Sequence, residues 1–515
     1  MTEGAEDSMP HSPALHLRTR AFIDGAFVDA QSGQTLPIVN PANGKTLANV
    51  AACAAIDVDA AVKAARRAFE DGRWRRQHPR DRKRVLLRFA ELIDTQLPEL
   101  ALMETLNVGK PIRDTSSLDI PKTAGMIRWY AEAIDKLYGD VAPTGEEALA
   151  FVTREPLGVI GAVIPWNFPA YLAAYKLGPA LATGNSVVLK PADQSPLTAL
   201  RLAELASEAG LPDGVLNVIP GAGPTAGAAL GRHPDVDCIA FTGSAHVARH
   251  FLRYAAESNL KRVQIEAGGK CPHVVLADAP DLDRVAHEVA WGIFFNQGQV
   301  CSAGSRLLVQ QPLARELVAK VAAIARGITL GDPLDPATQL GALVDKAQCD
   351  RVSRYVRAGV REGAELALGG RQVLEDTGGW FFEPTVFVNV SNSMQIAQEE
   401  IFGPVLSVIA FTDTAEAVQL ANGTVYGLGA AVWSRDIDQA LAIARDLRAG
   451  LVWVNNYDAS DLTVPWGGFK QSGNGRDKSL EALHEYTASK ATWIQIAHSP
   501  DTGPRAVRNV SRRKR

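Results

Sequence analysis

Residues 158–190 read GVIGAVIPWNFPAYLAAYKLGPALATGNSVVLK. Two short apolar, β-branched runs, 158–164 and 186–189, flank a helical stretch at 170–181. The same alternation continues down the chain, with strands predicted at 215–219, 238–241 and 262–265 and helices at 196–209, 225–230 and 247–257. Strands that alternate with helices indicate a parallel sheet covered on both faces, and such sheets bind ligands beyond the carboxyl ends of their strands.

A second alternating series begins near His273 and predicts a second sheet. Its strands are expected at 306–309, 385–390, 404–411, 429–433 and 451–454. The two series join near Gly268 and Gly269, which predicts two domains with a cleft between them. The expected fold class is therefore α/β, with two open parallel-sheet domains, the first of them Rossmann-like.

Composition places the chain among soluble globular proteins. Its 515 residues are 46% hydrophobic and 21% charged, and the formal net charge is -4, which argues against nucleic-acid or membrane-surface partners. The five cysteines are scattered and odd in number, without a C-x-x-C pair. That usage fits the reducing cytoplasm and disfavours a disulfide framework or a zinc site, so no metal is expected.

Three stretches outside the alternating pattern need a separate interpretation. Residues 1–18 carry acids and no apolar core, so we expect a disordered leader rather than a signal peptide. The basic stretch 499–515 could bind nucleic acid or anionic lipid, but a solvated, disordered tail is favoured. The uncharged run 156–175 is long enough to span a membrane, yet Pro165, Asn167 and Pro169 favour a buried strand and helix.

The run 296–306, NQGQVCSAGSR, presents Cys301 as a candidate nucleophile. A helical pattern at 281–295 ends at Gly298, so Cys301 is expected on a tight loop after a helix. A loop thiol on a rigid scaffold suits covalent catalysis. The alternative is that Cys301 is a small buried hydrophobe, as most free cysteines are.

Two polar residues at strand ends are candidates to assist covalent catalysis by Cys301. Asn167 follows the strand at 158–164, where its amide could donate to a developing oxyanion, or simply cap the next helix. Glu266 ends the strand at 262–265, where burial would make it a general base; the alternative is a solvated or helix-capping carboxylate.

Other strand ends carry residues suited to a dinucleotide. Lys190 and Asp193 could hold ribose hydroxyls or form only a surface ion pair. Gly243 and Ser244 join a strand to a helix, a setting for pyrophosphate, although G-x-G-x-x-G is absent. An acid and an aromatic stand before the strand at 404–411, in the window EEIFGP at 399–404.

Together these windows resemble the aldehyde dehydrogenase superfamily over roughly residues 21–496. Within it, IRWYAEAIDK at 127–136 and TVPWGGFKQSGNGRD at 463–477 are most similar to the γ-glutamyl-γ-aminobutyraldehyde dehydrogenases of putrescine breakdown. The resemblance implies that Cys301 is the nucleophile, Glu266 the general base and Asn167 the oxyanion amide, beside the Cys301 backbone N–H. It also implies that Lys176 assists proton movement.

The resemblance further implies an NAD site and a substrate tunnel. The implied cofactor residues are Lys190 and Asp193 at the adenosine ribose, Gly243 and Ser244 at the pyrophosphate, Glu400 and Phe402 at the nicotinamide ribose, with Pro165 and Trp166 nearby. Because Asp193 stands where Glu is more frequent, NADP remains the alternative. The implied tunnel residues are Tyr130, Phe168, Tyr171, Leu172, Tyr175, Asp458 and Trp466.

The expected reaction is oxidation of an aldehyde to its acid through a thiohemiacetal and a thioacyl enzyme, which water hydrolyses. By hypothesis Asp458 and Asp461 attract the amine of an ω-amino or γ-glutamylamino aldehyde; alternatively both acids cap the turn at 457–462. The other readings are a broad-specificity enzyme for simple aldehydes and a non-catalytic binding or structural protein.

The family organisation is expected to extend to domains and assembly. Residues 19–143 and 159–269 would form the NAD-binding domain, and residues 270–475 the catalytic domain. Segments 144–158 and 476–498 would form a small β oligomerisation element, which implies a homodimer or homotetramer.

Overall fold

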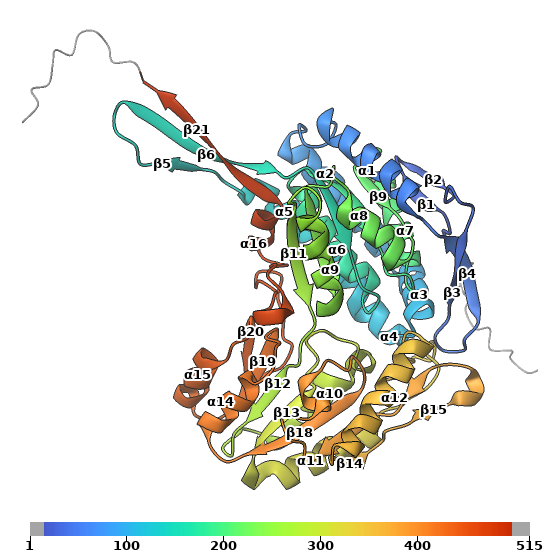
Figure 1. Cartoon of the computed structure of the whole chain (residues 1–515), viewed down its shortest axis with the longest axis vertical. Coiled ribbons are helices and arrows are strands. Elements are labelled where there is room, and N and C mark those ends of the chain that lie inside the picture. Colours follow the sequence, from blue (N-terminus) through green and yellow to red (C-terminus); the bar gives the residue numbers. More distant parts are fainter. Residues whose placement is uncertain (1–14, 497–515) are drawn as a thin grey trace, which may run out of the picture.

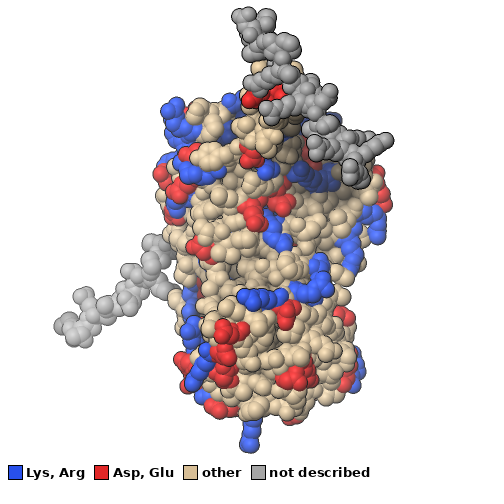
Figure 2. All heavy atoms as spheres, turned by 90° about the vertical axis from the view of Figure 1, so that its left-hand side faces the viewer, with Lys and Arg blue, Asp and Glu red and all other residues tan. Residues whose placement is uncertain are grey.

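The computed structural model describes residues 15–496. Of the disordered leader predicted at 1–18, residues 1–14 lie outside the described residues, as does the basic stretch 499–515 for which disorder was also predicted. Arg18, at the end of that predicted leader, forms an ion pair with Glu204 at 2.9 Å. Two sheet domains, one above the other in Figure 1, carry a projecting β arm on the upper one. Basic and acidic side chains are interspersed over the face shown in Figure 2.

The first sheet has seven strands in the order β11-β10-β7-β8-β9-β1-β2. The predicted alternation is confirmed, because five strands run parallel: β7 (Val159–Val163), β8 (Ser186–Lys190), β9 (Leu216–Val218), β10 (Cys238–Gly243) and β11 (Arg262–Ala267). An antiparallel hairpin, β1 (Ala21–Ile23) and β2 (Ala26–Val28), completes one edge.

Helices cover both faces of the first sheet. One face carries α1 (Ala55–Glu70), α8 (Ala228–Arg232) and α9 (Ala245–Ala256). The other carries α6 (Pro169–Ala182) and α7 (Leu197–Glu208), with α2 (Pro79–Thr95), α3 (Leu97–Val108) and α5 (Ile120–Ala133) packed behind them. Every residue of α6 is buried between these layers, which explains why its sequence is uncharged apart from Lys176. In residues 15–496 no helix has the length and apolarity needed to cross a bilayer.

The second sheet also has seven strands, in the order β14-β17-β18-β13-β12-β19-β20. Its parallel strands are β12 (Pro272–Val275), β13 (Arg306–Gln310), β17 (Thr385–Val388), β18 (Val405–Phe411), β19 (Gly429–Trp433) and β20 (Leu451–Val454). The edge strand β14 (Glu365–Leu368) is antiparallel.

The helices of the second domain divide between the two faces of its sheet. α10 (Leu282–Phe294) and α11 (Gln311–Arg326) pack together on one face. α12 (Lys346–Arg361), α14 (Thr414–Asn422) and α15 (Ile437–Asp446) enclose a separate apolar core on the other. α10 begins where the Asp281 carboxylate accepts a hydrogen bond from the Arg284 N–H, and it buries Val285, Val289 and Ile293 on its inner face.

A three-stranded antiparallel arm projects from the first domain (Figure 1). Its strands are β5 (Asp140–Ala142), β6 (Ala148–Pro156) and β21 (Thr487–Gln495). β6 and β21 are paired along their whole lengths, from Ala148–Gln495 to Pro156–Thr487. The arm also includes β5, which the predicted boundary at residue 143 leaves in the first domain, because β5 finds its hydrogen-bonding partner in β6.

The remaining elements are short. The two-stranded pairs are β3 (Thr35–Val39) with β4 (Thr46–Ala51) and β15 (Gln372–Val373) with β16 (Phe381–Phe382). The short helical turns are α4 (Ile112–Asp114), η1 (Thr115–Asp119), η2 (Ile134–Lys136), η3 (Gly223–Gly227), η4 (Phe295–Gly298), α13 (Gln395–Gln398), η5 (Glu375–Thr377), η6 (Lys470–Ser472) and α16 (Glu481–Glu485).

The chain crosses between the domains from the end of β11 to the start of β12. The carboxyl ends of the first sheet therefore point at the amino ends of the second. Loops that follow strands in one domain meet loops that precede strands in the other, and the candidate site lies where they meet.

Candidate active site

Two cavities meet at Cys301 and Asn167. The larger, here called the interdomain cavity, has a volume of about 760 Å³ and is lined from the first domain by Pro165, Trp166, Gly243, Ser244 and Glu266 and from the second by Glu400 and Phe402. The smaller, here called the aromatic cavity, has a volume of about 600 Å³ and lies on the other side of Cys301. A thiol shared by two cavities can react with a ligand held in either one.

The Cys301 loop follows α10, as predicted. η4 holds Asn296 and Gln297 at positive φ values of 49° and 58°, and Gly298 follows at 69°. A side chain at Gly298 would place its Cβ 2.2 Å from the Gly403 carbonyl oxygen, so only glycine fits there. Three consecutive left-handed residues are costly, and packing against the neighbouring loop holds them in place.

The environment of Cys301 disfavours its thiolate. Burial raises the pKa of the thiol well above its ordinary value, and the carboxylates of Glu266 and Glu400 raise it further. The residue is nevertheless partly exposed through the cavities, whereas the other four free cysteines are buried. Attack by Cys301 therefore needs a base to take its proton.

Glu266 is placed to be that base. It lies in β11 beside the strand's carboxyl end, lines the interdomain cavity and has one carboxylate oxygen without a partner in the described structure. Burial raises its pKa to about 8, and Asp477 adds to the shift. A carboxyl group whose pKa lies near neutrality can both accept and return a proton at physiological pH.

Lys176 lies on α6, outside the linings of the two cavities. Its Nζ donates a hydrogen bond of 2.6 Å to the Asp477 carboxylate, and both side chains are buried. Its positive charge lowers the pKa of Glu266 and so partly offsets the effect of Asp477. Lys176 therefore acts on Glu266 electrostatically, and the described structure shows no hydrogen bond or ion pair between the two side chains.

Asn167 does not cap α6, because Phe168 takes that position without a side-chain hydrogen bond. The Asn167 Nδ2 instead donates to the Gln299 carbonyl oxygen at 2.8 Å, and Asn296 donates back to the Asn167 carbonyl oxygen at 3.1 Å. An amide nitrogen carries two N–H groups, so the second remains for an oxygen on a ligand bound at Cys301.

The interdomain cavity fits a dinucleotide. Buried oxygens of Thr242 and Glu400 are unpaired in the described structure, and burial raises the pKa of Glu400 to about 7. Ser244 begins α9, whose free N–H groups suit a phosphate. The Trp166 and Phe402 rings meet edge to face at 5.2 Å. Ribose hydroxyls would satisfy the unpaired carboxylate oxygen.

Lys190 and Asp193 lie outside the lining of the interdomain cavity. Lys190 ends β8 and donates to Asp193 at 2.7 Å and to the Pro191 carbonyl oxygen at 2.8 Å. They occupy the carboxyl edge of the same sheet as the Pro165 loop. An extended ligand that leaves the cavity along this edge would reach them.

The aromatic cavity contains most of the predicted tunnel residues. Its walls include Phe168, Tyr171, Leu172, Tyr175, Asp458 and Trp466. Tyr130 is not on this wall: it is fully buried and donates to the Ser479 carbonyl oxygen at 3.3 Å. Asp461 is not on it either, because its carboxylate accepts hydrogen bonds from the Thr463 N–H and hydroxyl at 2.8 and 2.6 Å.

The two aspartates therefore differ. Asp461 matches the turn-capping alternative, whereas Asp458 lines the cavity and accepts a hydrogen bond from the Ser302 hydroxyl at 3.1 Å. The pKa of Asp458 is raised by desolvation, although the residue remains accessible to solvent. Hydrophobic patterning cannot distinguish two acids three residues apart on one loop.

Two charged wall residues were missed from sequence, Lys122 and Lys478. Lys478 directly follows the window 463–477 that carries the subfamily resemblance, so its position held a usable signal. Lys122 lies on α5, whose helical pattern does not show which face meets the cavity. A further lysine, Lys110, places its Nζ 3.5 Å from the centre of the Phe168 ring. This cation–π contact holds Phe168 in position in the wall of the aromatic cavity.

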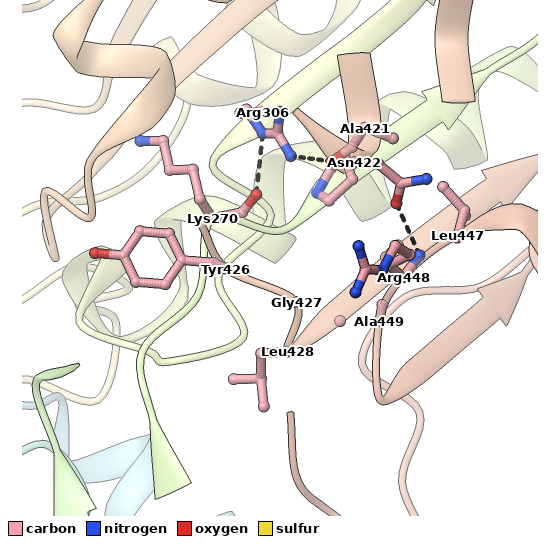
Figure 3. A pocket seen from close by; sticks show the side chains of 13 residues that line it. Lys270, Arg306, Ala421, Asn422, Tyr426, Gly427, Leu428, Leu447, Arg448 and Ala449 are labelled. Carbon is pink, nitrogen blue, oxygen red and sulfur yellow. Dashed lines mark hydrogen bonds between the residues drawn. The ribbon is translucent and has the colours of Figure 1, made fainter. Parts of the chain in front are cut away.

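Lys270, in the window after Glu266, lines a separate small pocket on the second-domain side (Figure 3). Arg306 is fully buried there and donates to the carbonyl oxygens of Lys270, Leu420 and Ala421 at 3.0, 2.8 and 2.7 Å. The guanidinium thereby ties the start of β12 to the end of α14. Among residues 15–496, no group of three or more His, Cys, Asp or Glu is placed to hold a metal ion.

Comparison with known proteins identifies relatives along almost the whole chain. The model of the aldehyde dehydrogenase family matches residues 27–492. The NADP/NAD-dependent aldehyde dehydrogenase PuuC of Escherichia coli (strain K12) is 51% identical over 484 residues, which cover 94% of this chain and 97% of PuuC.

Two solved structures share the fold, each with a TM-score of 0.93, 54% identity, and coverage of 94% of this chain and 98% of the other. One is a γ-glutamyl-γ-aminobutyraldehyde dehydrogenase from Burkholderia cenocepacia J2315. The other is the P. syringae indole-3-acetaldehyde dehydrogenase AldA, in complex with NAD+ and IAA.

Cys301 should be the cysteine that iodoacetamide labels first, because it is partly exposed through the cavities whereas the other four free thiols are buried. Peptide mass spectrometry after brief labelling should find Cys301 modified at least about tenfold more than Cys271. The Cys271→Ala variant should keep the rapid iodoacetamide labelling, and the Cys301→Ala variant should lose it. Preferential labelling of Cys271 would show that the loop is not the accessible thiol site.

Proposed function

The chain belongs to the aldehyde dehydrogenase family, and we propose that it oxidises an amine-derived aldehyde to its carboxylic acid with NAD as the hydride acceptor. The observation that carries the proposal is the arrangement of Cys301, Glu266 and Asn167 at the junction of two cavities. One cavity suits a dinucleotide and the other an extended, partly apolar substrate.

The proposed chemistry begins at Cys301. Glu266 accepts the thiol proton, and the sulfur attacks the aldehyde carbon to form a tetrahedral adduct. The free N–H of Asn167 and the backbone N–H of Cys301 stabilise its oxyanion. Loss of hydride leaves a thioester on Cys301. Glu266 releases the first proton to solvent and then takes a proton from water, which attacks the thioester. The acid is released as the C–S bond breaks, and the proton on Glu266 restores the thiol.

NAD, when bound, supplies only the hydride acceptor of this sequence. Glu400 and Phe402 would hold its nicotinamide ribose, and Ser244 with Gly243 its pyrophosphate, beside Pro165 and Trp166. Lys190 and Asp193 would meet the adenosine ribose beyond the cavity. An acid at residue 193 disfavours a 2′-phosphate, although the PuuC relative is described as NADP/NAD-dependent, so NADP remains the alternative cofactor.

The amine-derived substrate class rests on Asp458 and the aromatic wall. Tyr171 and Tyr175 meet edge to face at 4.8 Å, and such rings can grip methylene groups or a cation. The name of the Burkholderia cenocepacia structure supports the same class. The relative named for indole-3-acetaldehyde, equally similar, supports the alternative of a broader aromatic and aliphatic range.

The free thiols of all five cysteines support a cytoplasmic location.

Glu266→Gln tests the mechanism. Stopped-flow mixing with NAD and an aldehyde should show steady NADH formation in the original protein and a fall in turnover of about 100- to 10,000-fold in the variant. Because the base form is required and the Glu266 pKa is raised to about 8, turnover should rise about tenfold from pH 6 to 7 and then level off as the pH passes 8. If the original protein formed no NADH with any aldehyde, the result would instead favour a non-catalytic binding protein.

Asp458→Asn tests the amine preference, with Asp461→Asn as the matched control outside the cavity. Relative to hexanal, kcat/KM for 4-aminobutanal should fall about five- to tenfold in the first variant, because the carboxylate attracts the ammonium. The Asp461→Asn control should keep the relative kcat/KM values of the original protein for the two aldehydes. Equal losses for both aldehydes in Asp458→Asn would refute a role for its charge.

The β arm would serve assembly into a homodimer or homotetramer. β21 and the segment near β5 expose Trp493, Ile494, Val141 and Tyr138 to solvent. Exposed apolar residues gathered on a projecting hairpin are typical of subunit contacts. The arm also has free edges in β5 and β21, where a second copy could extend the sheet.

Trp493→Glu should reduce the mass measured by light scattering after size-exclusion chromatography, because a charge would enter the proposed contact. Trp493 is 64% exposed within one chain. The matched control is Ile437→Glu in the second domain, which is 56% exposed and should leave the mass unchanged. An unchanged oligomer in Trp493→Glu would place the contact elsewhere.

A further inference from the structure

The charged groups on the wall of the aromatic cavity do not match a purely cationic substrate. Lys122, Lys478 and Asp458 line it, which gives two positive charges and one negative. A substrate tail carrying only an ammonium would therefore face net repulsion.

The backbone holds Lys478 in the cavity wall. Asp477, the preceding residue, exchanges two hydrogen bonds of 2.7 Å with Trp466, and the following Ser479 donates to the Leu462 carbonyl oxygen at 2.8 Å. Lys478 and Ser479 both have left-handed φ values, 58° and 50°. Two adjacent non-glycine residues in this region are strained, and such strain is found where surrounding structure positions a functional side chain.

Lys478 is nearly buried, with 3% of its surface exposed, yet it forms no ion pair with a carboxylate among the described residues. Its Nζ donates to the Ser460 hydroxyl and lies 4.7 and 5.6 Å from the ring centres of Trp466 and Tyr175. Three other buried lysines, Lys110, Lys176 and Lys190, pair with carboxylates. Buried Lys261 and Lys270 form no ion pair in the described part of the chain, but neither lines the aromatic cavity.

Burial lowers the pKa of Lys478 to about 8, and the charge of Lys122 lowers it further. The amine thus remains mostly protonated near pH 7, in a wall where its charge is poorly compensated. A hydroxyl and two aromatic faces offset only part of the cost of burying an ammonium group. An anion in the cavity would supply the missing partner.

We propose that Lys478 binds a carboxylate at the far end of the aldehyde substrate, with Lys122 as a second cation at the same wall. The inference rests on the proposed aldehyde oxidation and narrows its substrate class. The preferred aldehydes then carry a distal carboxylate, alone or together with an amine that meets Asp458. An amino acid head group, with both charges, matches these three side chains.

The test compares two aldehydes of equal length, 5-oxopentanoate and pentanal, by initial rates of NADH formation. Lys478→Met removes the charge and keeps the chain length, and Lys478→Asn removes it with a residue that tolerates positive φ. In both variants the ratio of kcat/KM for 5-oxopentanoate to that for pentanal should fall at least about tenfold, mainly through KM. Lys478→Arg should keep the ratio within about threefold, because it restores the charge.

A ratio of the two aldehydes removes effects common to both, which matters because Lys478 also interacts electrostatically with Cys301 and Glu266. Lys122→Met should lower the ratio by a smaller factor, because Lys122 is exposed. The matched control is Lys45→Met, which replaces an exposed lysine between β3 and β4 and should leave the kcat/KM ratio unchanged.

Unchanged ratios in folded Lys478→Met and Lys478→Asn would overturn the carboxylate assignment while leaving the proposed oxidation intact. Failure of the original protein to form NADH with either aldehyde would refute the proposed oxidation instead. Thermal denaturation of each variant separates loss of folding from loss of recognition.

Discussion

A reciprocal pair of amide hydrogen bonds holds the reacting centre together. Asn167 donates across the domain boundary to the Gln299 carbonyl oxygen, and Asn296 donates back to the carbonyl oxygen of Asn167. Both side chains are buried, so breaking either bond would leave polar groups without water. Because Cys301 lies two residues after Gln299, these bonds hold the Asn167 amide beside the Cys301 thiol. Relative movement of the two domains would have to break them.

Loss of water is the main cause of the electrostatic character of the site. Burial is the leading reason for the raised pKa of Cys301, Glu266 and Glu400, and for the lowered pKa of Lys478. Each shift disfavours the charged form. The same enclosure therefore weakens the resting nucleophile, prepares the base to act near neutrality, and leaves a lysine suited to an anionic partner.

Much of the architecture was predictable because it is local. The strand and helix alternation of 158–190 became β7, α6 and β8, and the loop position of Cys301 followed from the end of the α10 pattern. Predictions about individual cavity walls were less accurate. Tyr130 lies behind the wall and Asp461 caps its own loop, since neither helix periodicity nor a loop sequence specifies which polar group a cavity will enclose. Lys478 was missed for the same reason.

The sequence by itself determined the two α/β domains, the loop that carries Cys301 and the family of the chain, because periodicity and motifs reside within short windows. Only the tertiary structure decided which loops meet. It joins the carboxyl ends of one sheet to the amino ends of the other and pairs Lys176 with Asp477, 301 residues apart. It also buries Lys478 without a carboxylate beside it. Burial and charge compensation arise from such distant contacts, so a linear pattern does not contain them.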